Sequence, residues 1–360
     1  MTDVNQPPPS VAPPALLQVE QLQQYFTLGG GLLKKGRTLY AVDGVSFSLA
    51  PGKTLGLVGE SGCGKSTLAR ALLKLQEPTG GRIVFDGQDI TAYSPRQMRP
   101  LRQQMQLVFQ DPQESLNSRH TVETILQEPF VIHGRGTRAE RKVWTTELLA
   151  RVGLPASALG RYPHEFSGGQ RQRIGIARAM ALKPKLLVCD EAVSALDVSV
   201  QSQILNLLLS LQQEHQLALL FIAHDLSVVK HISDDIAVMY LGRIIELAPA
   251  DELYHHPRHP YTQALLAAIP RPNPRQRFAP AMLIGEPPSP ANPPSGCHFR
   301  TRCPYAGELC AKQPPRLNSE GLVNKEHHVA CHYHQQIAEG SRLPKSAADY
   351  DNIASLSSSS

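Results

Sequence analysis

A stretch of nine residues has the composition and spacing of a phosphate-binding loop: Gly59-Glu60-Ser61-Gly62-Cys63-Gly64-Lys65-Ser66-Thr67. Its three glycines allow the backbone to turn tightly and to aim successive N–H groups at a polyphosphate. Lys65 is placed to reach the terminal phosphates, and the hydroxyl of Ser66 is placed to bind Mg²⁺. We therefore predict that this segment binds ATP or GTP.

Two flanking segments must hold this loop in place. Residues 53–58 form a short apolar run that predicts a buried strand, and residues 68–75 have the composition of a helix. Strand, glycine-rich loop and helix in this order are the context that a phosphate-binding loop requires, because the positive end of the helix adds to the field of the N–H groups.

A pair of carboxylates ends another apolar run. Residues 185–191 are nearly continuous apolar sequence up to Asp190 and Glu191, as expected of a central parallel strand that is covered on both faces. Because ligands bind at the carboxyl ends of such strands, Asp190 is placed to hold Mg²⁺ and Glu191 to accept a proton from the attacking water. The pair therefore predicts hydrolysis of the bound nucleotide.

A second candidate anion site lies at the start of a predicted helix, in Phe166-Ser167-Gly168-Gly169-Gln170. The serine hydroxyl and the glycine N–H groups would stand at the positive end of that helix. A Ser-Gly-Gly sequence alone is often only a turn and a helix cap. A phosphate-binding loop in the same chain favours a role in nucleotide binding.

The remaining pattern alternates between strands and helices and indicates an α/β fold. Further strands are predicted at residues 16–25, 40–49, 82–85 and 217–223, a closing hairpin at 236–241 and 243–247, and helices at 121–132, 139–152 and 200–213. We expect a disordered proline-rich segment at 1–14, a nucleotide-binding domain at 15–255 with a helical subdomain at about 112–184, a cysteine-rich extension at 256–335, and a disordered tail at 336–360.

Composition limits the class of protein. The chain has 360 residues, of which 41% are apolar, enough for a sizeable core, and its net charge of +5 is too small to indicate binding to nucleic acid. The longest apolar run, at 217–223, is too short to cross a membrane, and the first residues lack the basic start and apolar segment of a signal peptide. We expect the protein to remain in the cytosol.

The motifs together resemble those of the ATP-binding cassette (ABC) ATPases, and the resemblance covers residues 16–254. It implies that Gln110 senses Mg²⁺ and touches the transmembrane partner, that Ser194-Ala195-Leu196-Asp197 is the D-loop, and that His224 contacts the γ-phosphate. It also implies that Ser167 to Gln170, the signature motif, cover ATP held by a second subunit. A chain with one phosphate-binding loop therefore needs a partner to complete its site.

Two positions depart from the ABC pattern, and one assignment has alternatives. Phe166 stands where the signature usually has leucine, and Ala192 stands where proline commonly follows the catalytic glutamate. Both carboxylates remain in place. Alignment of the first strand favours Phe26 as the aromatic residue that stacks on adenine, with Tyr25 and Tyr40 as the alternatives.

Four cysteines gather late in the chain: Cys297, Cys303, Cys310 and Cys331. The intervals of five, six and twenty residues match neither the short zinc-knuckle spacing nor the ferredoxin runs. In a reducing compartment such a cluster indicates metal before disulfides, and unpaired buried thiols are the alternative. Five nearby histidines could contribute zinc ligands: His298, His327, His328, His332 and His334.

A second resemblance bears on these cysteines. The segments at 259–266 (HPYTQALL) and 285–290 (GEPPSP), followed by Gly296 and Cys297, are similar to the C-terminal extension of peptide-importer ATPases. In that subfamily the four cysteines hold a [4Fe–4S] cluster. Nearly the whole chain resembles the second ATPase subunit of bacterial dipeptide importers.

The resemblance implies an ATP-hydrolysing subunit, bound to Mg²⁺ and ATP, that energises an inner-membrane ABC importer of dipeptides or oligopeptides. Its partners would be a homologous second ATPase subunit, two transmembrane permease subunits and a periplasmic substrate-binding protein, with the chain on the cytoplasmic face of the membrane. Nickel, glutathione or another small cargo is the alternative within transport.

Three rivals lie outside transport. A chromosome-maintenance or DNA-repair ABC ATPase needs a long coiled-coil insertion, for which there is no room between Gln110 and Ser167. Translation-factor ABC proteins join two cassettes in one chain, and this chain has one phosphate-binding loop. A metal or redox sensor built on an inactive cassette is disfavoured because Lys65, Glu191 and His224 are intact.

Overall fold

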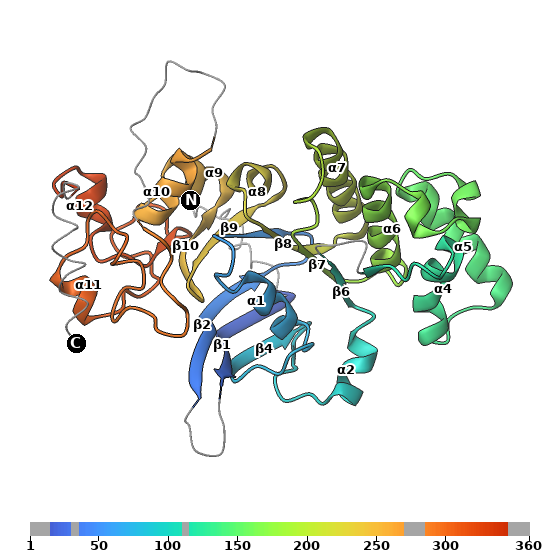
Figure 1. Cartoon of the computed structure of the whole chain (residues 1–360), viewed down its shortest axis with the longest axis horizontal. Helices are drawn as coiled ribbons and strands as arrows, with labels where there is room; N and C mark the ends of the chain where they lie inside the picture. The colour runs from blue at the N-terminus through green and yellow to red at the C-terminus, as the bar shows by residue number, and fades with distance from the viewer. Residues whose placement is uncertain (1–14, 30–35, 110–114, 270–284, 345–360) are drawn as a thin grey trace, which may run out of the picture.

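A seven-stranded sheet with the strand order β11-β10-β9-β3-β8-β7-β6 forms the centre of the computed structural model, which describes residues 15–29, 36–109, 115–269 and 285–344 (Figure 1). Strands β6 to β9 and β3 run parallel, and β10 and β11 are antiparallel to their neighbours. The strands are β3 (Thr54–Val58), β6 (Met105–Val108), β7 (Leu186–Asp190), β8 (Ala218–Ala223), β9 (Asp235–Tyr240), β10 (Arg243–Pro249) and β11 (His328–Val329).

The apolar runs of the sequence are the central parallel strands. Every residue of β3, β7 and β8 is buried, which explains why these segments lack the alternation of a half-exposed strand. In the ladders, Val58 pairs with Ala223 and Asp190 pairs with Ile222. The carboxyl ends of the three strands therefore meet at one edge, where the predicted chemistry lies.

A smaller antiparallel sheet faces the phosphate-binding segment. Its order is β2-β1-β4-β5, built from β1 (Leu17–Leu28), β2 (Arg37–Leu49), β4 (Gly80–Phe85) and β5 (Gln88–Asp89). Helix α1 (Lys65–Leu72) buries Leu68 and Leu72 in a core that also contains residues of both sheets. This core fixes the helix that follows the phosphate-binding loop.

A group of helices stands between β6 and β7 in the chain and gathers beside β6 and β7 (Figure 1). Helices α4 (Val122–Ile132) and α5 (Arg138–Arg151) agree closely with the sequence prediction, and each has a threonine cap, Thr121 and Thr137. After two short 3₁₀ turns, Ala156–Gly160 and Pro163–Glu165, comes α6 (Gly168–Met180). Helix α7 (Val198–His215) packs against α6.

Three shorter helices complete the nucleotide-binding part of the chain. Helix α2 (Pro95–Leu101) follows β5, α8 (Leu226–Ile232) follows β8, and α9 (Ala250–His255) follows β10. The sequence analysis does not predict α2 or α8, because each is only seven residues long and carries little periodic signal. Among the described residues, no helix is both long and apolar enough to cross a membrane.

The C-terminal extension is joined to the central sheet. Its short strand β11 pairs with β10, so that Val329 lies opposite Glu246 and His328 opposite Leu247. The extension also contains α10 (Pro260–Ala267), α11 (Glu308–Lys312) and α12 (His334–Ala338). The central sheet therefore continues into the extension that the sequence predicts at 256–335.

A buried carboxylate ties the extension to β10. Glu246 is fully buried, and its two oxygens accept the backbone N–H groups of Arg258 at 2.6 Å and His259 at 3.0 Å. A ring nitrogen of His327 lies 2.8 Å from the same carboxylate. With three partners, the cost of burying this charge is offset, and the chain after residue 256 is held against the sheet.

The ordered part of the extension runs past residue 335. The N–H of the Arg342 guanidinium donates to the backbone oxygen of Tyr305 at 2.8 Å, and its centre lies 3.6 Å from the ring centroid of Tyr333. Arg342, within the segment that the sequence assigns to a disordered tail, is thus packed against the extension. The predicted disorder at 1–14 and 345–360, and Gln110, fall outside the described residues.

Candidate active site

The phosphate-binding loop lies between β3 and α1, as the sequence predicts. Gly64, the residue before the first turn of α1, has φ +109°, and a Cβ placed on it would stand 2.0 Å from the backbone oxygen of Ala41 on β2. Only glycine fits that conformation and that contact. The close approach of β2 therefore requires glycine at position 64 of the loop.

The Lys65 ammonium is directed back into the loop. The residue is buried, and its Nζ donates to the backbone oxygens of Gly59 at 2.8 Å and Glu60 at 3.1 Å. The same nitrogen is 3.9 Å from a carboxylate oxygen of Glu191. A buried cation between the loop and the end of β7 is suited to bind the terminal phosphates of a nucleotide.

Ser66 and Asp190 meet across the site. The Ser66 hydroxyl donates to a carboxylate oxygen of Asp190 at 2.9 Å, although 124 residues separate them in the chain. Burial raises the pKa of Asp190, and the hydrogen bond from Ser66 opposes that rise. A hydroxyl and a carboxylate are the hard oxygen ligands that Mg²⁺ prefers, so this pair fits the predicted ion.

Glu191 begins the turn that follows β7. Its backbone has φ +47°, a left-handed conformation that is uncommon for a residue with a side chain, and its N–H donates to the backbone oxygen of Ile222 at 3.0 Å. Its backbone oxygen accepts the hydroxyl of Ser194, the first residue of the D-loop. These bonds fix the turn although Ala192 replaces the usual proline. His224 follows β8 at the same edge and is exposed.

The signature segment forms the N-terminal cap of α6. The Ser167 hydroxyl accepts the N–H of Gln170 at 3.3 Å, and the Gln170 side chain accepts the N–H of Ser167 at 3.0 Å. Gly169 lies so close to α7 that a Cβ would stand 2.4 Å from the side chain of Val200. Asp197, at the other end of the D-loop, is the N-cap residue of α7.

The signature and the phosphate-binding loop lie in different parts of the molecule. Figure 1 places α6 beside α4, α5 and α7, whereas α1 lies beside β1 and β2. Ser167 is exposed at the start of α6, and Val198, which follows the D-loop, is 78% exposed. These two exposed positions leave the signature and the D-loop accessible to another chain.

The three candidate adenine-stacking aromatics lie on β1 and β2. Tyr25 pairs directly with Tyr40, their ring centroids are 4.9 Å apart, and the Tyr25 hydroxyl donates to Asp43 at 2.7 Å. Phe26, the next residue, points to the opposite face of the strand. Both tyrosine rings are thus engaged with each other, and Phe26 stays the predicted stacking residue.

The four late cysteines all lie in the extension, where two of them are joined through their backbones. The backbone N–H of Cys297 donates to the backbone oxygen of Cys310 at 2.7 Å. Burial, with a smaller contribution from neighbouring cysteines, raises the pKa of Cys297 to about 11 and that of Cys331 to about 12. In the described part of the chain, no three His, Cys, Asp or Glu side chains are grouped so as to hold a metal ion. The predicted metal centre therefore stays a prediction.

Four of the five histidines considered as alternative zinc ligands have other hydrogen-bond partners, and the buried Nδ1 of His334 has none among the described residues. One ring nitrogen of His298 lies 3.3 Å from the backbone oxygen of Leu241, and one of His332 lies 2.9 Å from that of Gln313. His327 contacts Glu246, and His328 lies 3.1 Å from the backbone oxygen of Glu326. His334 is buried.

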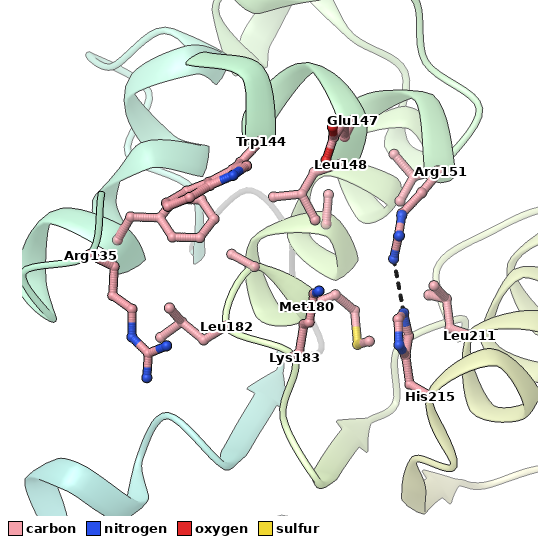
Figure 2. Close-up of a pocket in the computed structure, with 14 residues that line it drawn as sticks. Arg135, Trp144, Glu147, Leu148, Arg151, Met180, Leu182, Lys183, Leu211 and His215 are labelled. Carbon is pink, nitrogen blue, oxygen red and sulfur yellow. Dashed lines mark hydrogen bonds between the residues drawn. The ribbon is translucent and has the colours of Figure 1, made fainter. Parts of the chain in front are cut away.

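A cavity of about 330 Å³ lies away from these motifs, where α5 and the end of α6 meet α7 (Figure 2). Trp144 and Leu148 contribute apolar surface, and a guanidinium nitrogen of Arg151 lies 3.0 Å from the ring of His215. None of the residues that line this cavity belongs to the nucleotide motifs.

Family models and solved structures identify the class. The model described as "ABC transporter" matches residues 42–194. The structure of cbiO1 from Clostridium perfringens, described as part of the ABC transporter complex cbiONQ, is 28% identical with a TM-score of 0.59 and covers 67% of this chain and 91% of its own. A dimeric bacterial ABC transporter cassette, MJ0796, is 25% identical with the same TM-score and covers 65% and 98%. The fold and the site are those of an ABC ATPase.

Relatives that match over most of the chain identify a narrower family within the ABC ATPases. The model described as "Oligopeptide/dipeptide transporter, C-terminal region" matches residues 245–310. The oligopeptide transport ATP-binding protein AppF of Bacillus subtilis is 53% identical over 88% of this chain and 97% of its own length. A putative peptide import ATP-binding protein of Brucella ovis is 54% identical over 88% and 97%. The chain belongs to the ATP-binding subunits of oligopeptide and dipeptide ABC transporters.

Proposed function

We propose that this chain hydrolyses ATP to energise peptide import by an ABC transporter, with dipeptides or oligopeptides as its cargo. One observation carries the proposal: a full-length relationship to peptide-transport ATPases, which includes their C-terminal region, accompanies the nucleotide motifs at one sheet edge. Nucleotide binding, the first step of that activity, is supported by the contacts described for Lys65, Ser66 and Asp190.

The residues of the site divide the work of hydrolysis. Lys65 holds the terminal phosphates. Ser66 and Asp190 would hold Mg²⁺, which would neutralise charge on those phosphates. Glu191 accepts the proton of the attacking water, and His224 contacts the γ-phosphate. We also assign Gln110 to the Mg²⁺ site and to the contact with the transmembrane partner, and Phe26 to adenine stacking.

The exposed signature supports an obligatory partner. Ser167 to Gln170 and Asp197 are assigned to ATP held by the phosphate-binding loop of a homologous second ATPase subunit. The complete importer would add two transmembrane permease subunits and a periplasmic substrate-binding protein, with this chain on the cytoplasmic face of the inner membrane. ATP then drives the cycle because it binds the closed pair of cassettes more tightly than the open pair.

Transport in proteoliposomes tests this function and its cargo. We expect the complete complex, in vesicles that enclose ATP and are oriented for import, to take up a labelled dipeptide or oligopeptide. Vesicles that differ only in carrying the Lys65→Ala complex should take up none. Nickel and glutathione, supplied singly, are the alternative cargoes. ATP-dependent uptake of either one without any peptide uptake would contradict the peptide assignment.

We further propose that Cys297, Cys303, Cys310 and Cys331 hold one [4Fe–4S] cluster with a structural role. The thiols are buried or half-buried, and the backbone N–H of Cys297 donates to the backbone oxygen of Cys310 at 2.7 Å, so these two segments adjoin. When bound, the cluster would staple a proline-rich segment that has few large apolar side chains. Thiolates are the ligands that such clusters take.

Removing one cysteine is expected to release the cluster. Anaerobically purified wild-type protein should be brown, with about four irons per chain and a broad absorbance band at about 400 nm. Cys303→Ser should lose most of the iron and make the chain after Pro257 sensitive to protease, while nucleotide still binds. Cys63→Ser, which changes a buried cysteine outside the group, is the matched control and should keep its iron. Stoichiometric zinc without iron would overturn the cluster.

A further inference from the structure

The phosphate-binding loop carries an acidic side chain. Glu60 follows Gly59 directly, and its backbone oxygen accepts the Lys65 ammonium at 3.1 Å, so the residue lies beside the group that binds the phosphates. A carboxylate in that position repels a polyanionic nucleotide unless another charge neutralises it. The loop itself supplies one cation, Lys65, which is also needed for the phosphates.

An arginine of the C-terminal extension neutralises this carboxylate. The two terminal nitrogens of Arg302 donate to the two carboxylate oxygens of Glu60, at 2.7 and 3.0 Å, across 242 residues of sequence. The Arg302 side chain is only 5% exposed and that of Glu60 27%. A bidentate pair shielded from water holds both groups in one geometry.

The extension also binds the backbone of the same residue. The Glu60 N–H donates to the hydroxyl of Tyr261, on α10, at 2.9 Å. Tyr261 is fully buried, and its ring packs against those of Tyr240 and Phe299, with centroids 4.8 and 5.5 Å away. Because the rings fix the hydroxyl, Glu60 is held at its backbone and at its side chain.

We propose that Arg302 is a positioning residue for the ATPase reaction, which acts through Glu60 to neutralise and orient the phosphate-binding loop for ATP. The C-terminal extension thereby contributes directly to nucleotide affinity. Arg302 directly precedes Cys303, so an interaction that orders the segment around Cys303 also holds Arg302 against Glu60 and keeps that carboxylate neutralised near the nucleotide.

A double-mutant cycle on nucleotide binding tests the proposal. Equilibrium binding of a fluorescent ATP analogue is measured for the wild-type chain, Glu60→Gln, Arg302→Gln and the double variant, with the thermal midpoint and iron content followed in parallel. Arg302→Gln leaves Glu60 unneutralised and is expected to weaken binding about tenfold, the effect of one additional like charge several ångström from the phosphates. In the assembled transporter, KM for ATP should rise while kcat changes by less than about twofold.

The double variant separates charge from packing. Glu60→Gln combined with Arg302→Gln removes both charges and is expected to bind within about threefold of the wild type, as is Glu60→Gln alone. Arg300→Gln is the matched control, because among the described residues the Arg300 side chain donates to Ser295 of its own segment, and its affinity should not change.

Two results would overturn the proposal. One is wild-type affinity in folded Arg302→Gln, and the other is a double variant that binds as weakly as Arg302→Gln. If Arg302→Gln does not fold, Arg302→Lys replaces it in the comparison. Lysine loses the bidentate contact but keeps a positive charge beside Glu60, so binding is expected within about threefold of the wild type. Binding by folded Arg302→Lys that is tenfold weaker would equally contradict a role of charge.

Discussion

Glu191→Gln is expected to reduce ATP turnover by at least about a hundredfold while ATP binding is retained. Glutamine has nearly the same shape, so the left-handed turn after β7 and the backbone bonds to Ile222 and Ser194 should persist. The amide cannot accept the proton of the attacking water, so the rate of hydrolysis should fall while the affinity for ATP stays unchanged.

Two further variants serve as comparisons for Glu191→Gln. Lys65→Ala removes the buried ammonium and is expected to weaken binding of ATP itself, in contrast to Glu191→Gln. Glu214→Gln changes an exposed glutamate that pairs with Arg151, and it should leave both properties unchanged. Turnover is measured by phosphate release from the complete complex, and binding with a fluorescent ATP analogue. Wild-type turnover in Glu191→Gln would remove the residue from its assigned role.

Local sequence patterns predict the parts of the site that depend on single strands. The runs at 53–58, 185–191 and 217–223 are apolar because β3, β7 and β8 are buried on both faces, and parallel strands necessarily bring their carboxyl ends together. The structure therefore confirms that the phosphate-binding loop and Asp190 share one edge. The roles of the individual residues there stay predictions.

Contacts between distant segments leave no such pattern. The two residues of β11 are too few to show periodicity, and they become a strand only because β10 offers an unpaired edge. The Glu60–Arg302 pair joins residues that look like an ordinary loop position and a surface cation when each is taken in its own segment. Likewise, the hydroxyl that binds the Glu60 N–H lies within HPYTQALL, a segment that the sequence marks only through resemblance.

Ser167→Arg is expected to abolish turnover in the complete complex without preventing ATP binding to the chain's own loop. Ser167 is exposed at the positive end of α6, where the proposed pairing places the γ-phosphate of the partner's ATP. An arginine side chain would fill that space and prevent the two cassettes from closing. The substitution also removes the cap on Gln170, which costs about 0.5–2 kcal/mol and is separable from the block.

Closure is measured as an ATP-dependent increase in mass when the subunit is mixed with its partner ATPase, in a Glu191→Gln background that retains ATP. Ser167→Arg should show no increase. Ser167→Ala, which loses the cap but adds no bulk, reports the thermal cost of the cap alone. Ser210→Arg, the same change at an exposed serine of α7 whose hydroxyl donates to the backbone oxygen of Leu207, should close normally. Because the signature acts on the partner's nucleotide, closure and turnover must be lost together, and full turnover by Ser167→Arg would contradict the shared site.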